Sequence, residues 1–316
     1  MGNLLEFIKS QKRIQKLKRG NAPYRVQFYD FWEQEVTDMW LYRFIDSHRL
    51  LGNSRKKICF FSTFGNRDDV ENIRGDVKVF FSGENLKRGT FGKFSDHLLN
   101  NEKVDLALGF EYFEEVRYLR FPLWLLYMFD PESREDDIVK RCKSLDRPAV
   151  KRRPRFACHI SSEDTLGLRK KMCEEISQIA KVDCSGKVMH NCDDLWDVYD
   201  DDKMKFLSEY KFNICPENSN CYGYVTEKVF QAVDAGCVPI YWGSFNNPEP
   251  EVLNQQAILF WNKDGDNNKN LEFIRQLNES EKLYEEFSSQ KRLVQNAAEY
   301  VICKFDDLES KLRELI

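Results

Sequence analysis

Short apolar runs that alternate with polar or helical stretches constrain the fold of this chain most strongly. The runs are rich in β-branched and aromatic residues, as strands are. Strands that are separated by longer connections are typical of a parallel sheet covered by helices. The runs occupy residues 24–32, 57–64, 77–85, 104–110, 155–162, 211–218, 237–243 and 257–261. We therefore predict an α/β fold.

A segment dense in charge and proline divides these runs into two sets. It lies between Asp130 and Arg155 and contains DPESREDD and DRPAVKRRPR. Prolines and clustered charges are typical of a connecting segment. The chain of 316 residues is also long for one hydrophobic core and suits two. We predict an N-terminal domain of residues 1–150 and a C-terminal domain of residues 151–316.

An amphipathic helix is predicted at each end of the chain. Residues 4–19 place apolar side chains at helical spacing among lysines and arginines. Such a basic helix suits peripheral contact with an anionic membrane surface, or packing on the body of the protein. Residues 294–315 also step by three and four, with charges of both signs. We expect this last helix to pack back on the N-terminal domain.

The composition argues against several classes of protein. A net charge of −4 gives no overall field that would attract nucleic acid. The ten cysteines contain no CxxC pair, which argues against a zinc ribbon or redox motif, and reduced thiols indicate a cytosol. No apolar run suits a signal peptide or a membrane-spanning helix. We expect a soluble cytoplasmic protein, peripheral at most to the inner face of the membrane, with no nucleic-acid partner.

The stretch CPENSNCYGYVTEKVFQAVDAGCVPIYWGS, residues 215–244, predicts a loop, a helix and a strand after a buried strand. Thr226 suits the N-cap of that helix. Ligands of parallel sheets bind beyond the carboxyl ends of strands, where helix N-termini present unpaired N–H groups. Lys228 in the first turn suits a phosphate and Glu227 suits sugar hydroxyls, while Tyr222 and Tyr224 offer ring faces to a base or sugar. An ordinary pair of surface charges fits the same spacing.

This stretch also resembles a known family. PENSNCYGYVTEK followed by AGCVPIYWGS resembles the donor-binding signature of the bacterial and animal α-1,3-fucosyltransferases of glycosyltransferase family ten. FFSGEN and VDLALGF with RYLRFPLW are similar to the family's acceptor-side segments, and SSEDTLGLRKKM is similar to the stretch with its phosphate-binding arginine. The resemblance covers most of residues 77–243 in the expected order. This sequence departs from the family pattern in two places. It has CPENS where FENS is more frequent, and it lacks a tail of heptad repeats after the catalytic region.

The resemblance implies a GT-B type fold, in which two Rossmann-like domains face each other across a cleft. The implied reaction is the inverting transfer of L-fucose from GDP-β-L-fucose to an oligosaccharide, at O3 of N-acetylglucosamine or glucose in a lactosamine- or lactose-type glycan. Preference for O3 over O4 stays open. Glu84 matches the family's general base, and no metal or other cofactor is required, although a divalent cation could stimulate the reaction. The implied donor contacts are Arg169, Asn218, Tyr224, Glu227 and Lys228.

Two alternatives accompany this interpretation. A non-catalytic module that binds a nucleotide sugar or a glycan would keep the donor site without turnover. A metal-dependent glycosyltransferase would use Asp200 and Asp202, whose DxD spacing suits a divalent cation on a sugar diphosphate. The same aspartates precede a helical pattern, where Asp is favoured as a cap, and we prefer that structural role.

Overall fold

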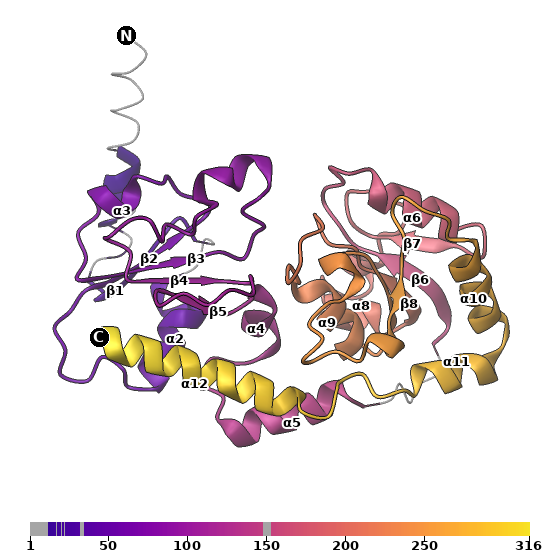
Figure 1. The fold of residues 1–316 in the computed structure, drawn as a ribbon. Helices are drawn as coiled ribbons and strands as arrows, with labels where there is room; N and C mark the ends of the chain where they lie inside the picture. The colour runs from indigo at the N-terminus through magenta and orange to yellow at the C-terminus, as the bar shows by residue number, and fades with distance from the viewer. Residues whose placement is uncertain (1–11, 17, 20, 22, 32–34, 148–152) are drawn as a thin grey trace, which may run out of the picture. The chain divides into compact units, whose positions relative to one another are not determined.

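The computed structural model describes residues 12–16, 18–19, 21, 23–31, 35–147 and 153–316. They form two compact units (Figure 1). Unit 1 comprises residues 1–133 and 303–316, and unit 2 comprises residues 134–302. The boundary that we predicted after residue 150 lies within the sequence of unit 2. Most of the predicted basic helix at residues 4–19 lies outside the described residues.

Unit 1 is built on a five-stranded sheet in which all strands are parallel and follow their order in the chain, β1-β2-β3-β4-β5. The strands are buried along their whole length. A strand covered on both faces favours apolar side chains at most positions, which explains the largely apolar runs. The strands are β1 (Val26–Tyr29), β2 (Ile58–Ser62), β3 (Val77–Phe81), β4 (Leu106–Gly109) and β5 (Tyr118–Arg120).

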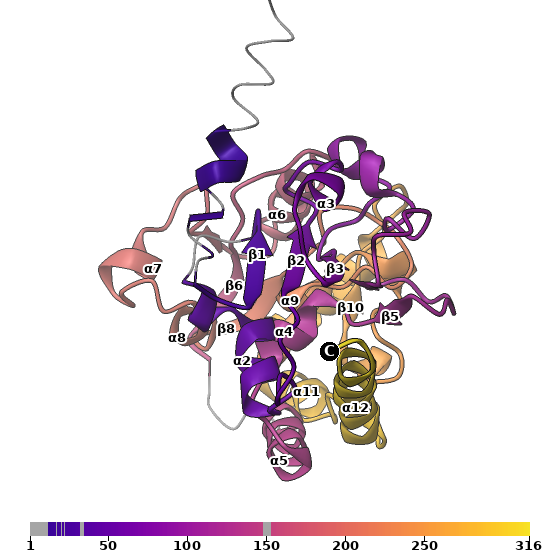
Figure 2. The same cartoon turned by 90° about the vertical axis from the view of Figure 1, so that its left-hand side faces the viewer.

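Helices cover both faces of this sheet (Figure 2). Short helices α3 and η2 contribute Val70 and Phe94 to the core on one face. On the other face, Phe44 of α2 and Phe121 before α4 contact the last helix, α12. The bounds are η1 (Val36–Asp38), α2 (Trp40–Ser47), α3 (Asp69–Asn72), η2 (Gly89–Phe94), α4 (Leu123–Met128) and α12 (Ala297–Leu315).

Helix α12 belongs to unit 1 from Cys303 onward. Its Phe305 is buried in an aromatic cluster, with ring centroids 5.6 to 6.2 Å from its neighbours. Near the end of the helix, Lys56 Nζ donates a hydrogen bond to the carbonyl oxygen of Leu315 at 2.7 Å. The apolar side chains spaced by three and four are therefore a buried face. The aromatic neighbours of Phe305 are Trp40, Phe44, Phe121 and Phe129.

Unit 2 also contains an all-parallel sheet of five strands, but its strand order is β10-β9-β8-β6-β7. The chain therefore builds outward from β6 in one direction to β7, and then in the other direction to β8, β9 and β10. This reversal is a topological switch point. The strands are β6 (Arg155–His159), β7 (Val182–Cys184), β8 (Tyr210–Ile214), β9 (Val238–Tyr241) and β10 (Leu259–Phe260).

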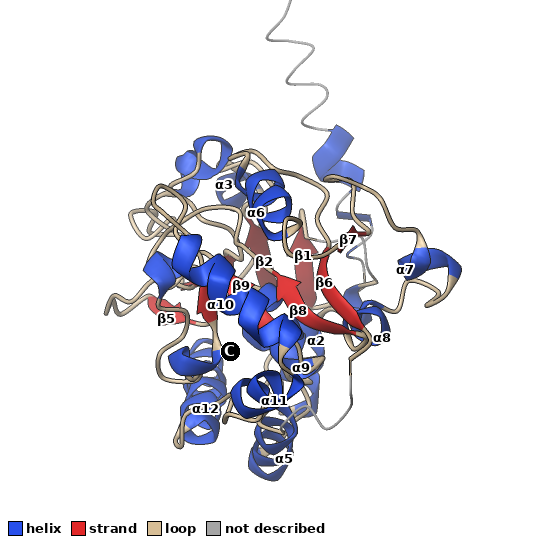
Figure 3. Cartoon of the chain, turned by 90° about the vertical axis from the view of Figure 1, so that its right-hand side faces the viewer, coloured by secondary structure: helices blue, strands red, loops and turns tan. Residues whose placement is uncertain are grey.

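Helices also cover both faces of the second sheet (Figure 3). Helices α6, α10 and α11 share one apolar core with the sheet, which includes Met172, Ile274 and Tyr284. Helices α8 and α9 pack against each other and against β8 and β9. The bounds are α5 (Glu135–Leu145), α6 (Leu168–Ile176), α7 (Asp194–Asp197), α8 (Lys203–Leu207), α9 (Glu227–Asp234), η3 (Ser244–Asn246), η4 (Gln255–Ala257), α10 (Asn268–Glu279) and α11 (Glu281–Ser288).

All eight strands that the sequence predicted are present, and the predicted α/β fold with parallel sheets is confirmed. Strands β5 and β7 were not predicted, because each has only three residues and no distinct apolar run.

All ten cysteines are free thiols, and nine of them are buried as small apolar residues. None of the helices within the described residues is both long and apolar enough to span a bilayer.

We expect Phe305→Ala to lower the free energy of unfolding of unit 1 by about 3–5 kcal/mol, because the change leaves a cavity within the aromatic cluster. Urea titration followed by tryptophan fluorescence measures the loss. Cys303→Ala is the matched control, since Cys303 lies on the same helix and is exposed. A loss below about 1 kcal/mol for Phe305→Ala would show that α12 contributes little to the core.

Candidate functional site

The switch point of unit 2 lies between β6 and β8, where ligands of open parallel sheets bind. The loops that leave the carboxyl ends of these strands run to α6 and to α9. His159, the last residue of β6, donates from Nδ1 to the carbonyl oxygen of Ile214, the last residue of β8, at 2.7 Å. Its Nε2 then accepts from Ser161 Oγ at 2.7 Å. Burial lowers the pKa of His159 to about 4, so the ring is neutral at pH 7.

The carboxylate of Glu217 organises the start of α9. Its side chain is fully buried. It accepts hydrogen bonds from the backbone N–H of Thr226 at 2.8 Å, from Thr226 Oγ1 at 2.8 Å and from Lys228 Nζ at 3.2 Å. Lys228 Nζ also donates to Thr226 Oγ1 at 2.7 Å. One buried carboxylate thus fixes both the entry of the chain into α9 and the position of the Lys228 ammonium.

Thr226 occupies the N-cap position of α9, as predicted, but the predicted capping bond is absent. Its hydroxyl donates to Glu217 and accepts from Lys228, and so it is not directed at the first-turn N–H groups. The reason is the buried carboxylate, which offers the hydroxyl a stronger, charge-assisted partner. The positive end of the α9 dipole and the Lys228 ammonium therefore lie together, a combination that favours an anion.

Opposite charges surround this helix start. Burial would raise the pKa of Glu227, but the ammonium groups of Lys228 and Lys203 outweigh it and lower that pKa. Burial would lower the pKa of Lys228, but the carboxylates of Glu217 and Glu227 outweigh it and raise that pKa. Glu227 and Lys228 are therefore both ionised at neutral pH. At Lys203, the first residue of α8, burial dominates and lowers the pKa.

Arg169, on the first turn of α6, is buried beside the loop that follows β8. Its guanidinium donates to Asn218 Oδ1, to the carbonyl oxygen of Pro216 at 3.4 Å and to that of Glu163. The carboxylate of Asp164 accepts from the backbone N–H groups of Arg169 and Lys170, at 3.1 and 2.9 Å, and so fixes the start of α6. Arg169 is followed by Lys170 and Lys171, a pattern that is typical of a solvated helix face. The structure instead brings Arg169 and Asn218 together across the switch point.

The two tyrosines of the loop differ in exposure. Tyr222 is 43% exposed, whereas Tyr224 is 1% exposed and its ring has no face open to solvent. Of the two ring faces expected to be available, only that of Tyr222 is therefore accessible in this structure. Gly243, just after β9, has φ of +147°, and a Cβ there would lie 2.7 Å from Glu217 Cγ. Glycine at this position lets the backbone pass close to the buried carboxylate.

The DxD aspartates lie at the start of α8. Asp202 is the N-cap of that helix, and its carboxylate accepts from the backbone N–H of Lys205 at 3.0 Å. It also contacts Lys205 Nζ at 2.9 Å. Asp202 therefore serves as a helix cap, the role that we preferred from the sequence. Within the described ranges, no group of three or more histidine, cysteine, aspartate or glutamate side chains could hold a metal ion.

Glu84 lies in unit 1, in the turn that follows β3. Ser82 Oγ donates to the carbonyl oxygen of Glu84 at 2.8 Å and accepts from its backbone N–H at 3.3 Å, which shapes the turn. Leu86 anchors the turn in the core. The Glu84 carboxylate is 23% exposed and lies 3.9 Å from Arg88 Nη1. It is thus a partly exposed carboxylate at the carboxyl edge of the first sheet, where parallel sheets carry their functional groups.

Sequence reasoning missed two charged residues of the unit 2 site, Glu217 and Lys203. Glu217 had a usable signal, because a carboxylate two residues beyond a strand-like run, beside Asn218, belongs to the carboxyl edge of a parallel sheet. Lys203 had none. It lies beside Glu227 only because α8 packs on α9.

Taken together, the unit 2 site offers a helix start, an ordered ammonium and a buried guanidinium for an anion, with the Glu227 carboxylate beside them for hydroxyl groups.

The chain matches two family models. Residues 150–307 match glycosyltransferase family 10 (fucosyltransferase), C-terminal part, and residues 26–127 match the N-terminal domain of α-(1,3)-fucosyltransferase FucT. The chain therefore belongs to glycosyltransferase family 10, the fucosyltransferases.

Curated relatives agree with this family. The chain is 27% identical over 218 residues to α-(1,3)-fucosyltransferase FucT of Helicobacter pylori, covering 61% of this chain and 42% of that protein. It is 32% identical to α-(1,3)-fucosyltransferase B of Drosophila melanogaster, over 40% of this chain and 30% of that protein. A 36% identical match to GDP-fucose protein O-fucosyltransferase 3 of Danio rerio covers 27% of this chain and 20% of that protein. The matched regions are less than half the length of these relatives.

Solved structures share the fold. A crystal structure of α1,3-fucosyltransferase with GDP-fucose matches with a TM-score of 0.58 at 21% identity, over 90% of this chain and 89% of that chain. A second crystal structure of α1,3-fucosyltransferase matches with a TM-score of 0.59 at 20% identity, with the same coverage. The predicted GT-B type class, with a Rossmann-like parallel sheet in each unit, is confirmed.

We expect the stability of unit 2 to fall as pH decreases from about 6.5 to about 4. The unfolded chain protonates His159 below pH 6.5, whereas the folded chain does so only near pH 4, so acid favours unfolding in this window. The contribution of His159 is about 3 kcal/mol. Hydrogen exchange of β6 and β8 amides measures it, and His159→Gln should flatten the pH dependence in this window. An unchanged slope in the variant would contradict the assignment.

Glu217→Ala should destabilise unit 2 by about 3 kcal/mol, because it leaves the Lys228 ammonium and the Thr226 N–H without their buried acceptor. Urea titration provides the measurement. Glu174→Ala is the matched control. Glu174 pairs with Lys170 at 3.7 Å on an exposed face of α6, and its loss should change stability by less than about 0.5 kcal/mol. Equal effects of the two changes would mean that Glu217 is not the organising residue.

Proposed function

We propose that this protein transfers L-fucose from GDP-β-L-fucose to a hydroxyl group of an oligosaccharide, with inversion at the anomeric carbon. The observation that carries the proposal is the charged site at the switch point of unit 2, where Glu217 orders Lys228 and Arg169 lies against Asn218. Membership of the fucosyltransferase family and the likeness to a structure solved with GDP-fucose support the choice of donor.

In this proposal, unit 2 holds the donor. The departing GDP carries the charge that develops during transfer, and positive groups fixed in advance stabilise it without reorganisation. Lys228, Arg169 and the N–H groups at the start of α9 supply that stabilisation. Glu227 accepts hydrogen bonds from sugar hydroxyls, and Asn218 positions Arg169. Tyr224 remains an expected donor contact on the strength of the family resemblance, although its ring is buried here.

Unit 1 supplies the base. An inverting transfer is an in-line displacement, in which the acceptor hydroxyl attacks the face of the sugar opposite the departing diphosphate. A carboxylate must accept the proton from that hydroxyl as the new bond forms. We assign this role to Glu84, whose carboxylate is partly exposed at the carboxyl edge of its sheet. These steps need no metal, because protein cations meet the charge of the departing group.

The proposed acceptor is O3 of N-acetylglucosamine or glucose in a lactosamine- or lactose-type glycan. Its support is the relatives from Helicobacter pylori and Drosophila melanogaster, which are named α-(1,3)-fucosyltransferases. The direct test incubates the purified chain with GDP-fucose and N-acetyllactosamine, with and without EDTA, and assigns the linkage of the product by NMR. Fucosylated product in EDTA supports the proposal and excludes a required metal. GDP-fucose binding without any product would instead favour the non-catalytic module.

Two variants should distinguish the role of the catalytic base from the role of the donor site. Glu84→Gln should lower kcat by about 100- to 10,000-fold because it removes the proton acceptor, while leaving the Kd for GDP unchanged. Lys228→Ala should weaken GDP binding by about 10- to 100-fold, because it removes a charged hydrogen-bond donor. Initial rates and titration calorimetry give the two quantities. A Glu84→Gln protein with wild-type kcat would refute the assignment of the base.

A further inference from the structure

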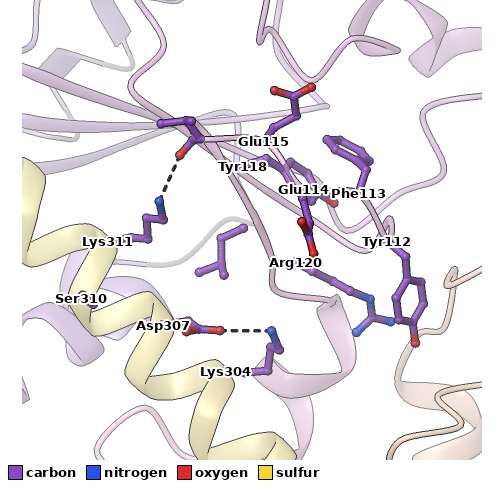
Figure 4. A pocket seen from close by; sticks show the side chains of 12 residues that line it. Tyr112, Phe113, Glu114, Glu115, Tyr118, Arg120, Lys304, Asp307, Ser310 and Lys311 are labelled. Carbon is purple, nitrogen blue, oxygen red and sulfur yellow. Dashed lines mark hydrogen bonds and ion pairs between the residues drawn. The ribbon is translucent and has the colours of Figure 1, made fainter.

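A groove of about 750 Å³ lies in unit 1 between strand β5 and helix α12 (Figure 4). Strand β5 is the edge strand of its sheet. Tyr112 and Phe113 line the groove on the side of β5, and Lys304 and Asp307 line it from α12. We call it the β5 groove. Its volume lies within the range of ligand-binding pockets.

The wall on the β5 side presents aromatic rings that are held in place and partly open. Tyr112 and Phe113 are each 37% exposed. The guanidinium of Arg120 lies over the Tyr112 ring at 3.9 Å, and the Phe113 ring stacks on Tyr118 with centroids 4.0 Å apart. Rings that are already fixed lose little conformational entropy when a ligand covers them. An aromatic face among polar groups suits a ligand with both apolar and hydroxyl surfaces, as a sugar ring has.

The charges of the β5 groove balance. Three acidic and three basic side chains line it: Glu114, Glu115, Asp307, Arg120, Lys304 and Lys311. Several are already engaged within the groove. Lys304 pairs with Asp307 at 3.2 Å, and Lys311 Nζ donates to the carbonyl oxygen of Val116 at 3.1 Å. A groove with balanced and internally paired charges does not select a polyanion or a polycation. It does offer donors and acceptors to a neutral, hydroxyl-rich ligand.

The loop that carries Tyr112 and the turn that carries the proposed base follow neighbouring strands. Glu84 follows β3, and the loop with Tyr112 follows β4, which pairs with β3 in parallel. At the carboxyl ends of these strands, the backbone N–H of Ser82 donates to the carbonyl oxygen of Leu108 at 2.9 Å. The two loops therefore leave the sheet from adjacent points. The loop that leads to Tyr112 therefore starts next to the turn that carries Glu84.

We propose that the β5 groove binds the saccharide units of a neutral acceptor oligosaccharide that lie beyond the unit receiving fucose. This proposal rests on the proposed function of the site and adds the length and charge of its acceptor. Tyr112 is then a residue that determines preference for longer acceptors. It takes no part in proton transfer or donor binding.

Initial rates with N-acetyllactosamine, and with a neutral tetrasaccharide that carries the same disaccharide at its non-reducing end, test this proposal. The wild type should show a KM at least about threefold lower for the tetrasaccharide. Tyr112→Ala should raise that KM by about three- to tenfold, the range expected for one aromatic contact, and leave the KM for the disaccharide unchanged. Tyr112→Phe should keep the preference. Tyr127→Ala is the matched control, since Tyr127 is half exposed in the same unit and does not line the groove.

Two results would overturn the β5 groove as an acceptor subsite: equal KM values for both acceptors in the wild type, or an equal rise for both in Tyr112→Ala. The failure of the proposed function is distinguishable from either, because then neither acceptor is fucosylated. In that case calorimetric titration of the full chain with the tetrasaccharide still decides whether the groove binds a glycan. Binding that Tyr112→Ala weakens supports the groove, and the absence of binding to the wild type refutes it.

Discussion

The buried carboxylate of Glu217 is the interaction on which the site of unit 2 depends. Its two oxygens accept from the Thr226 backbone, the Thr226 hydroxyl and the Lys228 ammonium, so one side chain determines where α9 begins and where its cation lies. A buried charge is tolerated only when it is paired and fully hydrogen-bonded. The same requirement explains Gly243, because any side chain there would collide with Glu217.

The strand order of unit 2 brings Arg169 to the loop that follows β8. Successive strands are added on one side of β6 and then on the other. The loops after β6 and β8 therefore leave adjacent strand ends and diverge. Arg169 and Asn218, 49 residues apart in sequence, consequently form a hydrogen bond. Neutral His159 joins the two strand ends, and its low pKa keeps a further positive charge away from Arg169. The site thus has cations where a diphosphate is expected to bind, and the His159 ring that joins the two strands is neutral.

Unit 1 uses the same kind of sheet for a different purpose. Its strands follow chain order, so it has no switch point, and the groups that we assign to the acceptor follow β3 and β4. Helix α12 comes from the far end of the chain and completes the unit through Phe305, while its polar side forms one wall of the β5 groove. In the proposed reaction, unit 1 binds the acceptor and unit 2 binds the donor. Cations and a helix start serve a diphosphate, whereas a partly exposed carboxylate and aromatic rings serve a neutral glycan.

The amino-acid sequence was enough to predict the features that depend on neighbours along the chain. Eight apolar runs specified eight strands, and Glu227-Lys228 after Thr226 specified a helix start with both charges, because periodicity and helix ends are local properties. It could not determine pairings between distant segments. The capture of the Thr226 hydroxyl and Lys228 by Glu217, the burial of Arg169 and Tyr224, the approach of Lys203 to Glu227 and the short strands β5 and β7 all arise from packing. By local spacing alone, these residues cannot be told apart from surface charges or loops, because the groups that are buried together come from segments far apart in the sequence.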